Sequence, residues 1–278
     1  MPDSPLVLAE QRETVLVLTL NRPERMNAWT DALEDQYFER LAAAEADPAV
    51  RAIVVTGAGR GFCAGADLDD LAAVGATGEA ADGAVTDRPP RSFPSTIRKP
   101  LIAALNGAAA GLGLVEALYC DVRFATPTAK LTTAFARRGL IAEYGISWLL
   151  PRIVGVSRAL DLLISGRVVL GDEAERIGLV DRVEPAERLV DEAVAYALDL
   201  ARNCSPTSMA VIKSQVQRHL SATFAEAVAD SDRLMLESFG WPDVAEGVTS
   251  YRERRPPAFP PLTSHMLPTF NSFASGVS

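Results

Sequence analysis

Histidine and cysteine, the side chains that most often bind zinc, are scarce in this chain of 278 residues, which has two histidines and three cysteines. Cys63, Cys120 and Cys204 stand far apart without a CxxC pair, and only His219 and His265 could join them. We therefore expect no zinc site. Three isolated cysteines fit a reducing cytoplasm, where each is expected to serve as a small buried apolar residue.

Positive charge is also in deficit, because 27 basic residues face 36 acidic ones and the net charge is −9. This balance argues against nucleic acid or an anionic membrane surface as a partner, although it leaves room for a local basic pocket that binds a phosphorylated ligand. The first ten residues, MPDSPLVLAE, lack the basic and apolar regions of a signal peptide. The most apolar window, residues 101–120, contains Asn106, Glu116 and three glycines, and we interpret it as core.

What the chain has is an alternation of short apolar strands and amphipathic helices. The expected strands are residues 14–21, 52–57, 100–107 and 121–126, and the expected helices are residues 30–46, a segment from about residue 67, and residues 112–119. Thr30 is placed to cap the first of these helices. The alternation predicts an α/β fold with crossover connections around a buried sheet.

Two segments depart from this pattern. Residues 75–95 are rich in Gly, Ala, Asp and Pro, and we expect a mobile lid or pocket wall there. From about Asp191 the pattern is helical, over residues 191–204, 205–220 and 223–239. The Pro-rich tail beyond Arg254 is expected to be extended or disordered.

The stretch RGFCAGADLDDL, residues 60–71, joins a predicted strand to a predicted helix. Asp67, Asp69 and Asp70 would lie in the first helical turn, where the helix dipole favours negative charge. The small residues before them allow another group to approach the backbone N–H groups closely. The turn is therefore a candidate binding element.

Several motifs together resemble the enoyl-CoA hydratase/isomerase family, the crotonase superfamily, in order and spacing over roughly residues 12–260. The matching segments are LNRPERMNAW (20–29), GRGFCAGADL (59–68), NGAAAGLGLVEALYCDVRFA (106–125), LPRIVG (150–155), SGRVVLGDEAERIGLVDRV (165–183) and EGVTSYRERRPPAF (246–259).

The resemblance implies a spiral of ββα units followed by helices that form a homotrimer or a dimer of trimers. It implies a CoA thioester as substrate and no separate cofactor. On this basis we expect an α/β core with the acyl-CoA site in residues 1–195, a helical trimerisation region in residues 196–260, and a tail in residues 261–278.

Family enzymes hold the thioester oxygen with two backbone N–H groups, which stabilise an enolate. Carried over by position, these donors are Ala64 and Leu112, and Leu112 begins a predicted helix, where unpaired N–H groups suit an oxyanion. The flanking residues expected to contact the substrate are Phe62, Gly65, Ala66 and Gly111. The alternative is that the glycines at 111 and 113 only permit tight packing.

The two glutamates that activate water in family hydratases are absent. Val115 and Phe135 occupy their positions in this sequence. Glu116 is next to Val115, but one helical step turns a side chain by about 100° away from the pocket. Glu116 is therefore interpreted as a structural or interface acid.

Glu143, in FARRGLIAEYG, matches the place of the catalytic glutamate in the peroxisomal type of Δ3,Δ2-enoyl-CoA isomerase. A single carboxylate suits a 1,3-proton shift, and an apolar pocket formed by Phe135, Ile141 and Trp148 would raise its pKa. Alternatively, Glu143 is a loop acid that pairs with Arg137 or Arg138.

The residues thus favour isomerisation of Δ3- to Δ2-enoyl-CoA. The alternatives are hydration, which is the commonest family activity, and a catalytically weak acyl-CoA-binding trimer. Hydrolysis by a Ser–His pair fits poorly, because neither histidine lies near a family motif.

Two charged residues are expected near the CoA moiety. Asp67 would line the pantetheine channel, although an acid in the first turn of a helix needs no ligand to explain it. Arg25 would lie near the CoA phosphates, and a solvated loop arginine is the alternative.

Overall fold

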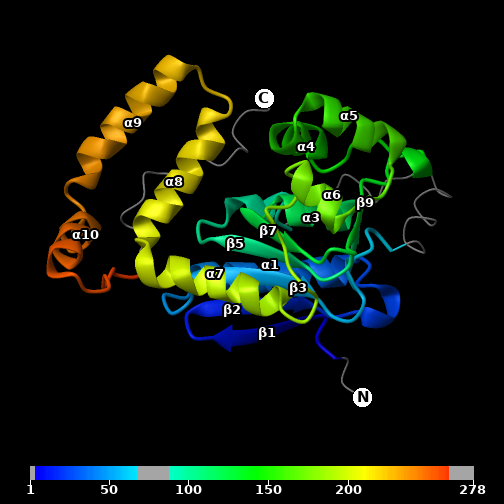
Figure 1. The fold of residues 1–278 in the computed structure, drawn as a ribbon, viewed down its shortest axis with the longest axis horizontal. Helices are drawn as coiled ribbons and strands as arrows, with labels where there is room; N and C mark the ends of the chain where they lie inside the picture. Colours follow the sequence, from blue (N-terminus) through cyan, green and yellow to red (C-terminus); the bar gives the residue numbers. More distant parts are fainter. Residues whose placement is uncertain (1–3, 68–87, 263–278) are drawn as a thin grey trace.

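The computed structural model describes residues 4–67 and 88–262, which fold around two β-sheets (Figure 1). The larger sheet has the strand order β1-β2-β3-β5-β7-β10 and the smaller one has the order β4-β6-β8-β9. The first contains β1 (Val7–Arg12), β2 (Val15–Leu20), β3 (Ala52–Gly57), β5 (Leu101–Leu105), β7 (Val122–Ala125) and β10 (Arg182–Val183). The second contains β4 (Gly61–Cys63), β6 (Ala108–Ala110), β8 (Lys130–Thr132) and β9 (Val169–Leu170).

The chain winds as a spiral, because successive turns add one strand to each sheet in alternation. β3 is followed by β4, β5 by β6, and β7 by β8, and the pairs β3–β5, β5–β7, β4–β6 and β6–β8 are all parallel. The hairpin β1–β2 and the β8–β9 pair are antiparallel. Parallel neighbours require crossover connections, and here the crossovers generate the repeated turn of the spiral.

Apolar side chains on both faces of the larger sheet explain why its strands are continuous apolar runs. Along β3, Ile53 and Val55 join the main core, whereas Ala52 and Val54 join a second cluster on the opposite face. The helices of the main core include α1 (Asp31–Ala46), α3 (Leu112–Leu118), α4 (Ile146–Val154), α5 (Val156–Ser165) and α6 (Gly171–Arg176). The second face is covered by α7 (Leu189–Asn203), which lies along β2 and β3 in Figure 1.

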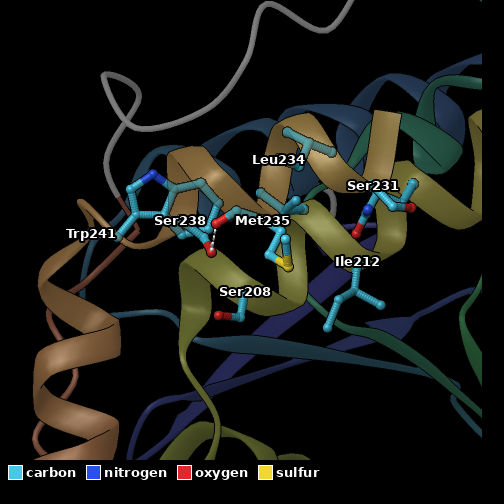
Figure 2. A pocket seen from close by; sticks show the side chains of 9 residues that line it. Ser208, Ile212, Ser231, Leu234, Met235, Ser238 and Trp241 are labelled. Carbon is cyan, nitrogen blue, oxygen red and sulfur yellow. Dashed lines mark hydrogen bonds between the residues drawn. The ribbon is translucent and has the colours of Figure 1, made fainter. Parts of the chain in front are cut away.

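Three more helices follow the core and extend away from it: α8 (Pro206–His219), α9 (Phe224–Ser238) and α10 (Pro242–Glu253). A groove of about 250 Å³ separates α8 from α9; Figure 2 shows Ile212 and Ser208 on one side and Leu234, Met235 and Trp241 on the other. Many apolar side chains of these helices are exposed, among them Phe224, Leu236 and Phe239. None of the described helices is long and apolar enough to cross a membrane.

The structure agrees with the predicted strands and helices of the first half. The strand at 52–57 is found at those bounds, and the helix at 30–46 is α1, with the Thr30 hydroxyl accepting a hydrogen bond from Leu33 N at 3.3 Å. The predicted boundary at 195/196 lies inside α7, whose Ala193 and Ala197 both contact the sheet. The helix expected from about residue 67, the part of the 75–95 segment before Arg88, and the tail beyond Leu262 lie outside the described residues.

Candidate active site

Two loops that begin at adjacent strands of the smaller sheet pack directly on each other. The first follows β4 and contains Ala64–Asp67, and the second joins β6 to α3 through Gly111. A Cβ atom on Gly113 would lie 2.3 Å from the carbonyl oxygen of Cys63, and one on Gly65, whose φ is +96°, would lie 2.8 Å from that of Ala110. Only glycine permits this approach, so the two loops form one unit.

Some backbone N–H groups of the first loop donate hydrogen bonds within the described chain, and others do not. The Ala64 N–H donates to Met26 O at 3.0 Å, and the Asp67 N–H donates to Trp29 O at 3.0 Å. The Ala66 N–H has no acceptor among the described residues, and Ala66 is exposed. In the second loop the Leu112 N–H, at the first position of α3, likewise has no acceptor in the described part of the chain. The available pair is therefore Ala66 and Leu112, and Ala64, the donor predicted from the sequence, is already bonded.

Two asparagines fix the position of the first loop. Asn27 is fully buried, and its amide donates to Ala58 O at 2.9 Å and to Gly61 O at 2.8 Å. Asn106 donates to Gly59 O at 3.0 Å and accepts from Gly57 N at 3.2 Å. Buried polar groups that are satisfied in this way hold a backbone rigidly. These bonds tie the sequence segments around residues 27 and 106 to the loop that follows β4.

Three predicted binding residues lie in different environments in the structure. Phe62 is buried in the main core. Asp67 is buried and accepts from both terminal nitrogens of Arg22 at 3.2 Å, so it has an internal ion pair. Arg25 is exposed in the short 3-10 helix Pro23–Arg25 at the surface. The pairing with Arg22 gives Asp67 a structural role that the sequence did not reveal.

The positions of the missing hydratase glutamates are apolar and closed. Val115 is fully buried in α3, and Phe135 is also buried. The Phe135 ring lies 3.9 Å from the point where a Cβ on Gly111 would be, next to the start of α3. Neither position can hold or deprotonate water.

Glu143 lies in the turn that leads into α4 and is partly exposed. The Tyr119 hydroxyl, at the end of α3, donates to Tyr144 O at 2.6 Å and so fixes this turn to the helix that begins at Leu112. Partial burial raises the pKa of Glu143, and the positive charge of Arg91 opposes this rise. The Glu143 carboxylate is therefore a stronger base than an ordinary glutamate.

The expected surroundings of Glu143 need one correction. Ile141 is 79% exposed, so it does not form a pocket wall, because its side chain projects from the loop into solvent. Trp148 is partly buried, with the Arg152 guanidinium 3.9 Å from its ring centre. Arg137 donates to Ser165 O at 2.7 Å, and its contacts therefore lie with the end of α5 and not with Glu143.

Glu116 is a buried acid without a hydrogen-bond partner among the described residues. Its side chain is 2% exposed, and burial, together with the negative charge of Glu34, raises its pKa well above the ordinary value. A structural acid was expected at this position. The degree of burial and the proximity to Glu34 of α1 could not be read from the sequence.

Comparisons with known proteins identify the family to which this fold and site belong. The family described as Enoyl-CoA hydratase/isomerase matches residues 10–261. The chain belongs to the enoyl-CoA hydratase/isomerase family. It is therefore an enzyme that acts on CoA thioesters, and the resemblance of its motifs to this family and the predicted crotonase-like fold are confirmed.

Individual relatives of the family cover nearly the whole chain. The 1,2-epoxyphenylacetyl-CoA isomerase of Escherichia coli is 37% identical over 91% of this chain and 97% of its own length. A probable enoyl-CoA hydratase of Rhizobium meliloti is 36% identical over the same shares. The crystal structure of a probable enoyl-CoA hydratase/isomerase from Mycobacterium abscessus superposes with a TM-score of 0.83 at 32% identity, covering 92% of this chain and 99% of that one. These relatives include both hydratases and an isomerase.

Proposed function

We propose that this enzyme of the enoyl-CoA hydratase/isomerase family shifts the double bond of a 3-enoyl-CoA to the 2 position, with Glu143 as the carboxylate base. The observation that carries the proposal is the pair of apolar residues, Val115 and Phe135, where a hydratase needs carboxylates, combined with a carboxyl group of raised pKa at Glu143. The Escherichia coli relative is named as an isomerase of an epoxidised CoA thioester, which supports isomerisation as the general type of reaction.

The thioester oxygen would accept hydrogen bonds from the N–H groups of Ala66 and Leu112. Both donors are free of other acceptors within the described residues, whereas the Ala64 N–H already bonds to Met26. The direct packing of the two loops holds the donors in place before substrate arrives. A preorganised donor of this kind contributes about 2.7–4 kcal/mol to the stability of the transition state.

In the proposed reaction, the Glu143 carboxylate removes a proton from C2 of the 3-enoyl thioester. The electron pair moves into the thioester carbonyl and forms a dienolate, whose oxygen bears the charge. Glu143 then returns the proton to C4, and the double bond forms between C2 and C3. The step needs no water and no cofactor, because one proton moves between two carbons of the same molecule.

Chain topology joins the turn of the proposed base to the helix that carries the Leu112 donor. Tyr119, which holds the Tyr144 carbonyl, follows Leu112 by seven residues, or about 10 Å along the helix axis. Phe135 packs at the start of the same helix and contributes an apolar wall.

The experiment is Glu143→Gln, which keeps the size of the side chain and removes its basicity. We expect turnover of 3-enoyl-CoA to fall by about 10²–10⁴-fold with little change in substrate binding, because the lost group acts in proton transfer. Isomerisation of 3-enoyl-CoA and hydration of crotonyl-CoA would be measured for the wild type and the variant. Brisk hydration that survives Glu143→Gln would overturn the proposal and favour the hydratase alternative.

We also propose that the enzyme works as a homotrimer or a dimer of trimers. A closed ring of three copies needs two different contact faces on each copy. Among the described residues, exposed apolar side chains lie on α5 (Val156, Leu160 and Ile164) and on α8, on α9 and just after α9 (Val216, Leu236 and Phe239), and Figure 1 shows α5 and α9 toward opposite ends of the molecule. Apolar patches of this kind mark association surfaces.

A further inference from the structure

Arg91 lies between α1 and the turn that carries Glu143. Its Nη2 atom is 3.4 Å from Asp31 Oδ1, and its Nε atom is 3.5 Å from Glu34 Oε2, both on α1. Its guanidinium carbon is 5.1 Å from the ring centre of Tyr144, the residue after Glu143. One side chain thus contacts both a core helix and the candidate catalytic turn.

The residues around Arg91 form a charged cluster that the proposed proton transfer does not use. Glu34 is buried and accepts from Trp29 Nε1 at 2.8 Å, which fixes its carboxylate. Glu116 of α3 interacts electrostatically with both Glu34 and Arg91. Among the described residues, the cluster also contains Arg88, which pairs with Asp31 and Asp35 of α1. Two of these charges, Glu34 and Glu116, are buried, and Arg91 links them to the candidate catalytic turn.

We propose that Arg91 is a positioning residue for Glu143: it fixes the Glu143–Tyr144 turn against α1 and directs a positive charge toward the Glu143 carboxylate without binding it. The proposal rests on the assignment of Glu143 as the base. Arg91 acts through Glu143 and takes no proton itself.

The two acids of α1 explain why Arg91 influences Glu143 only from a distance. No ion pair within 4 Å joins Arg91 to Glu143, whereas Arg91 lies within that limit of both Asp31 and Glu34. A direct ion pair would hold the Glu143 carboxylate and make it a weak base. Because α1 holds the guanidinium away from Glu143, no ion pair among the described residues engages the Glu143 carboxylate, and it keeps its basicity.

Two opposing effects determine the pKa of Glu143. Burial raises it, and the charge of Arg91 lowers it. Loss of the Arg91 charge should therefore raise the pKa further, so that Glu143 is protonated, and inactive as a base, up to a higher pH. Since Glu143 is partly exposed, solvent screens the effect, and we expect a shift of about 0.5–1 pH unit.

The experiment compares Arg91→Met and Arg91→Lys with Arg88→Met as a matched control. Arg88 also bonds to Asp31 and lies within 3.6 Å of Glu34, but it is absent from the interactions of Glu143. In the pH profile of kcat/KM for 3-enoyl-CoA, we expect the acidic limb of Arg91→Met to move up by about 0.5–1 pH unit, with kcat reduced more than KM is raised. For Arg88→Met, the acidic limb of the kcat/KM profile should lie at the same pH as in the wild type.

Arg91→Lys keeps the charge and loses the planar group that lies over Tyr144. It should restore the wild-type limb but only part of kcat. If Arg91→Met does not fold, the pH profile and kcat of Arg91→Lys still test the proposal. A wild-type profile for Arg91→Met, or the same shift in Arg88→Met, would overturn the proposal, and so would an acidic limb that moves in Arg91→Lys.

A second measurement separates this proposal from the assignment of the base. The Glu143 carboxyl resonance, identified in ¹³C-glutamate-labelled protein by its loss in Glu143→Gln, is titrated in the wild type and in Arg91→Met. An upward shift together with isomerase activity that survives Glu143→Gln would retain the Arg91–Glu143 coupling and reject Glu143 as the base. An unchanged titration would reject the coupling itself.

Discussion

Among single residues, Glu116 is the one whose environment conflicts most with its chemistry. Its carboxyl group is buried without a hydrogen-bond partner in the described part of the chain, next to a second acid, Glu34. An unsatisfied polar group of this kind costs about 1–3 kcal/mol of stability. Glu116 takes no part in the proposed reaction.

The pH dependence of this cost has a definite sign. The folded state raises the pKa of Glu116 above its unfolded value, so the folded protein binds a proton that the unfolded chain releases. Between the ordinary pKa of a glutamate, about 4.3, and the raised value in the fold, the free energy of unfolding therefore decreases as the pH rises.

We predict that Glu116→Leu stabilises the protein by about 1–3 kcal/mol at pH 8, because it replaces an unsatisfied carboxyl group with an apolar side chain of similar size. The gain should be smaller at pH 4, where the folded state is protonated at Glu116 and most of the unfolded chains are as well. Thermal unfolding at one fixed protein concentration would measure it. Glu39→Leu, at an exposed position of α1, should produce no such pH-dependent gain, and a destabilised Glu116→Leu would point to a ligand or partner of Glu116.

At the scale of elements, the candidate site depends on how closely the β4 loop approaches the start of α3. The approach is limited by backbone atoms, since the nearest neighbour of a Cβ on Gly113 would be the Cys63 carbonyl oxygen at 2.3 Å. A carbonyl in a strand cannot move aside as a flexible side chain can. The distance between the two proposed N–H donors is therefore set by a glycine in a helix.

We predict that Gly113→Ala lowers kcat/KM by at least 10²-fold, because moving α3 away from β4 displaces the Leu112 N–H from the thioester oxygen. Activity and binding of a CoA thioester would be measured together with thermal stability. Gly240→Ala is the control, because its Cβ would meet Glu237 O at an ordinary 3.5 Å. Full activity in Gly113→Ala would show that the donors do not depend on this contact.

At the scale of the whole molecule, the spiral core and the C-terminal helices bury their apolar residues differently. The core closes around two apolar clusters, whereas α9 buries only Leu234 and leaves Leu236 67% exposed within the single chain. Together with the apolar face of α5, this pattern supports assembly of several copies.

We predict a mass in solution that is a multiple of three chains, measured by light scattering. Leu236→Glu places a charge on the exposed apolar face of α9 and should shift the mass toward a single chain, because burial of an unpaired charge in an interface is costly. Arg40→Glu, on an exposed part of α1, adds negative charge elsewhere and should leave the mass unchanged. A wild-type protein that is a stable monomer would contradict the proposed trimer.

The sequence by itself determined the family, the α/β alternation and the absence of the hydratase carboxylates, because these depend on local patterns and motif spacing. The strand at 52–57, the Thr30 cap and the apolar character of Val115 and Phe135 are as predicted. The tertiary structure decided which N–H groups are available, since the bond from Ala64 to Met26 joins distant segments. It also decided the exposure of Ile141 and the cluster of Arg91, Glu34 and Glu116. Such contacts join residues far apart in the chain, and only the folded path of the backbone brings them together.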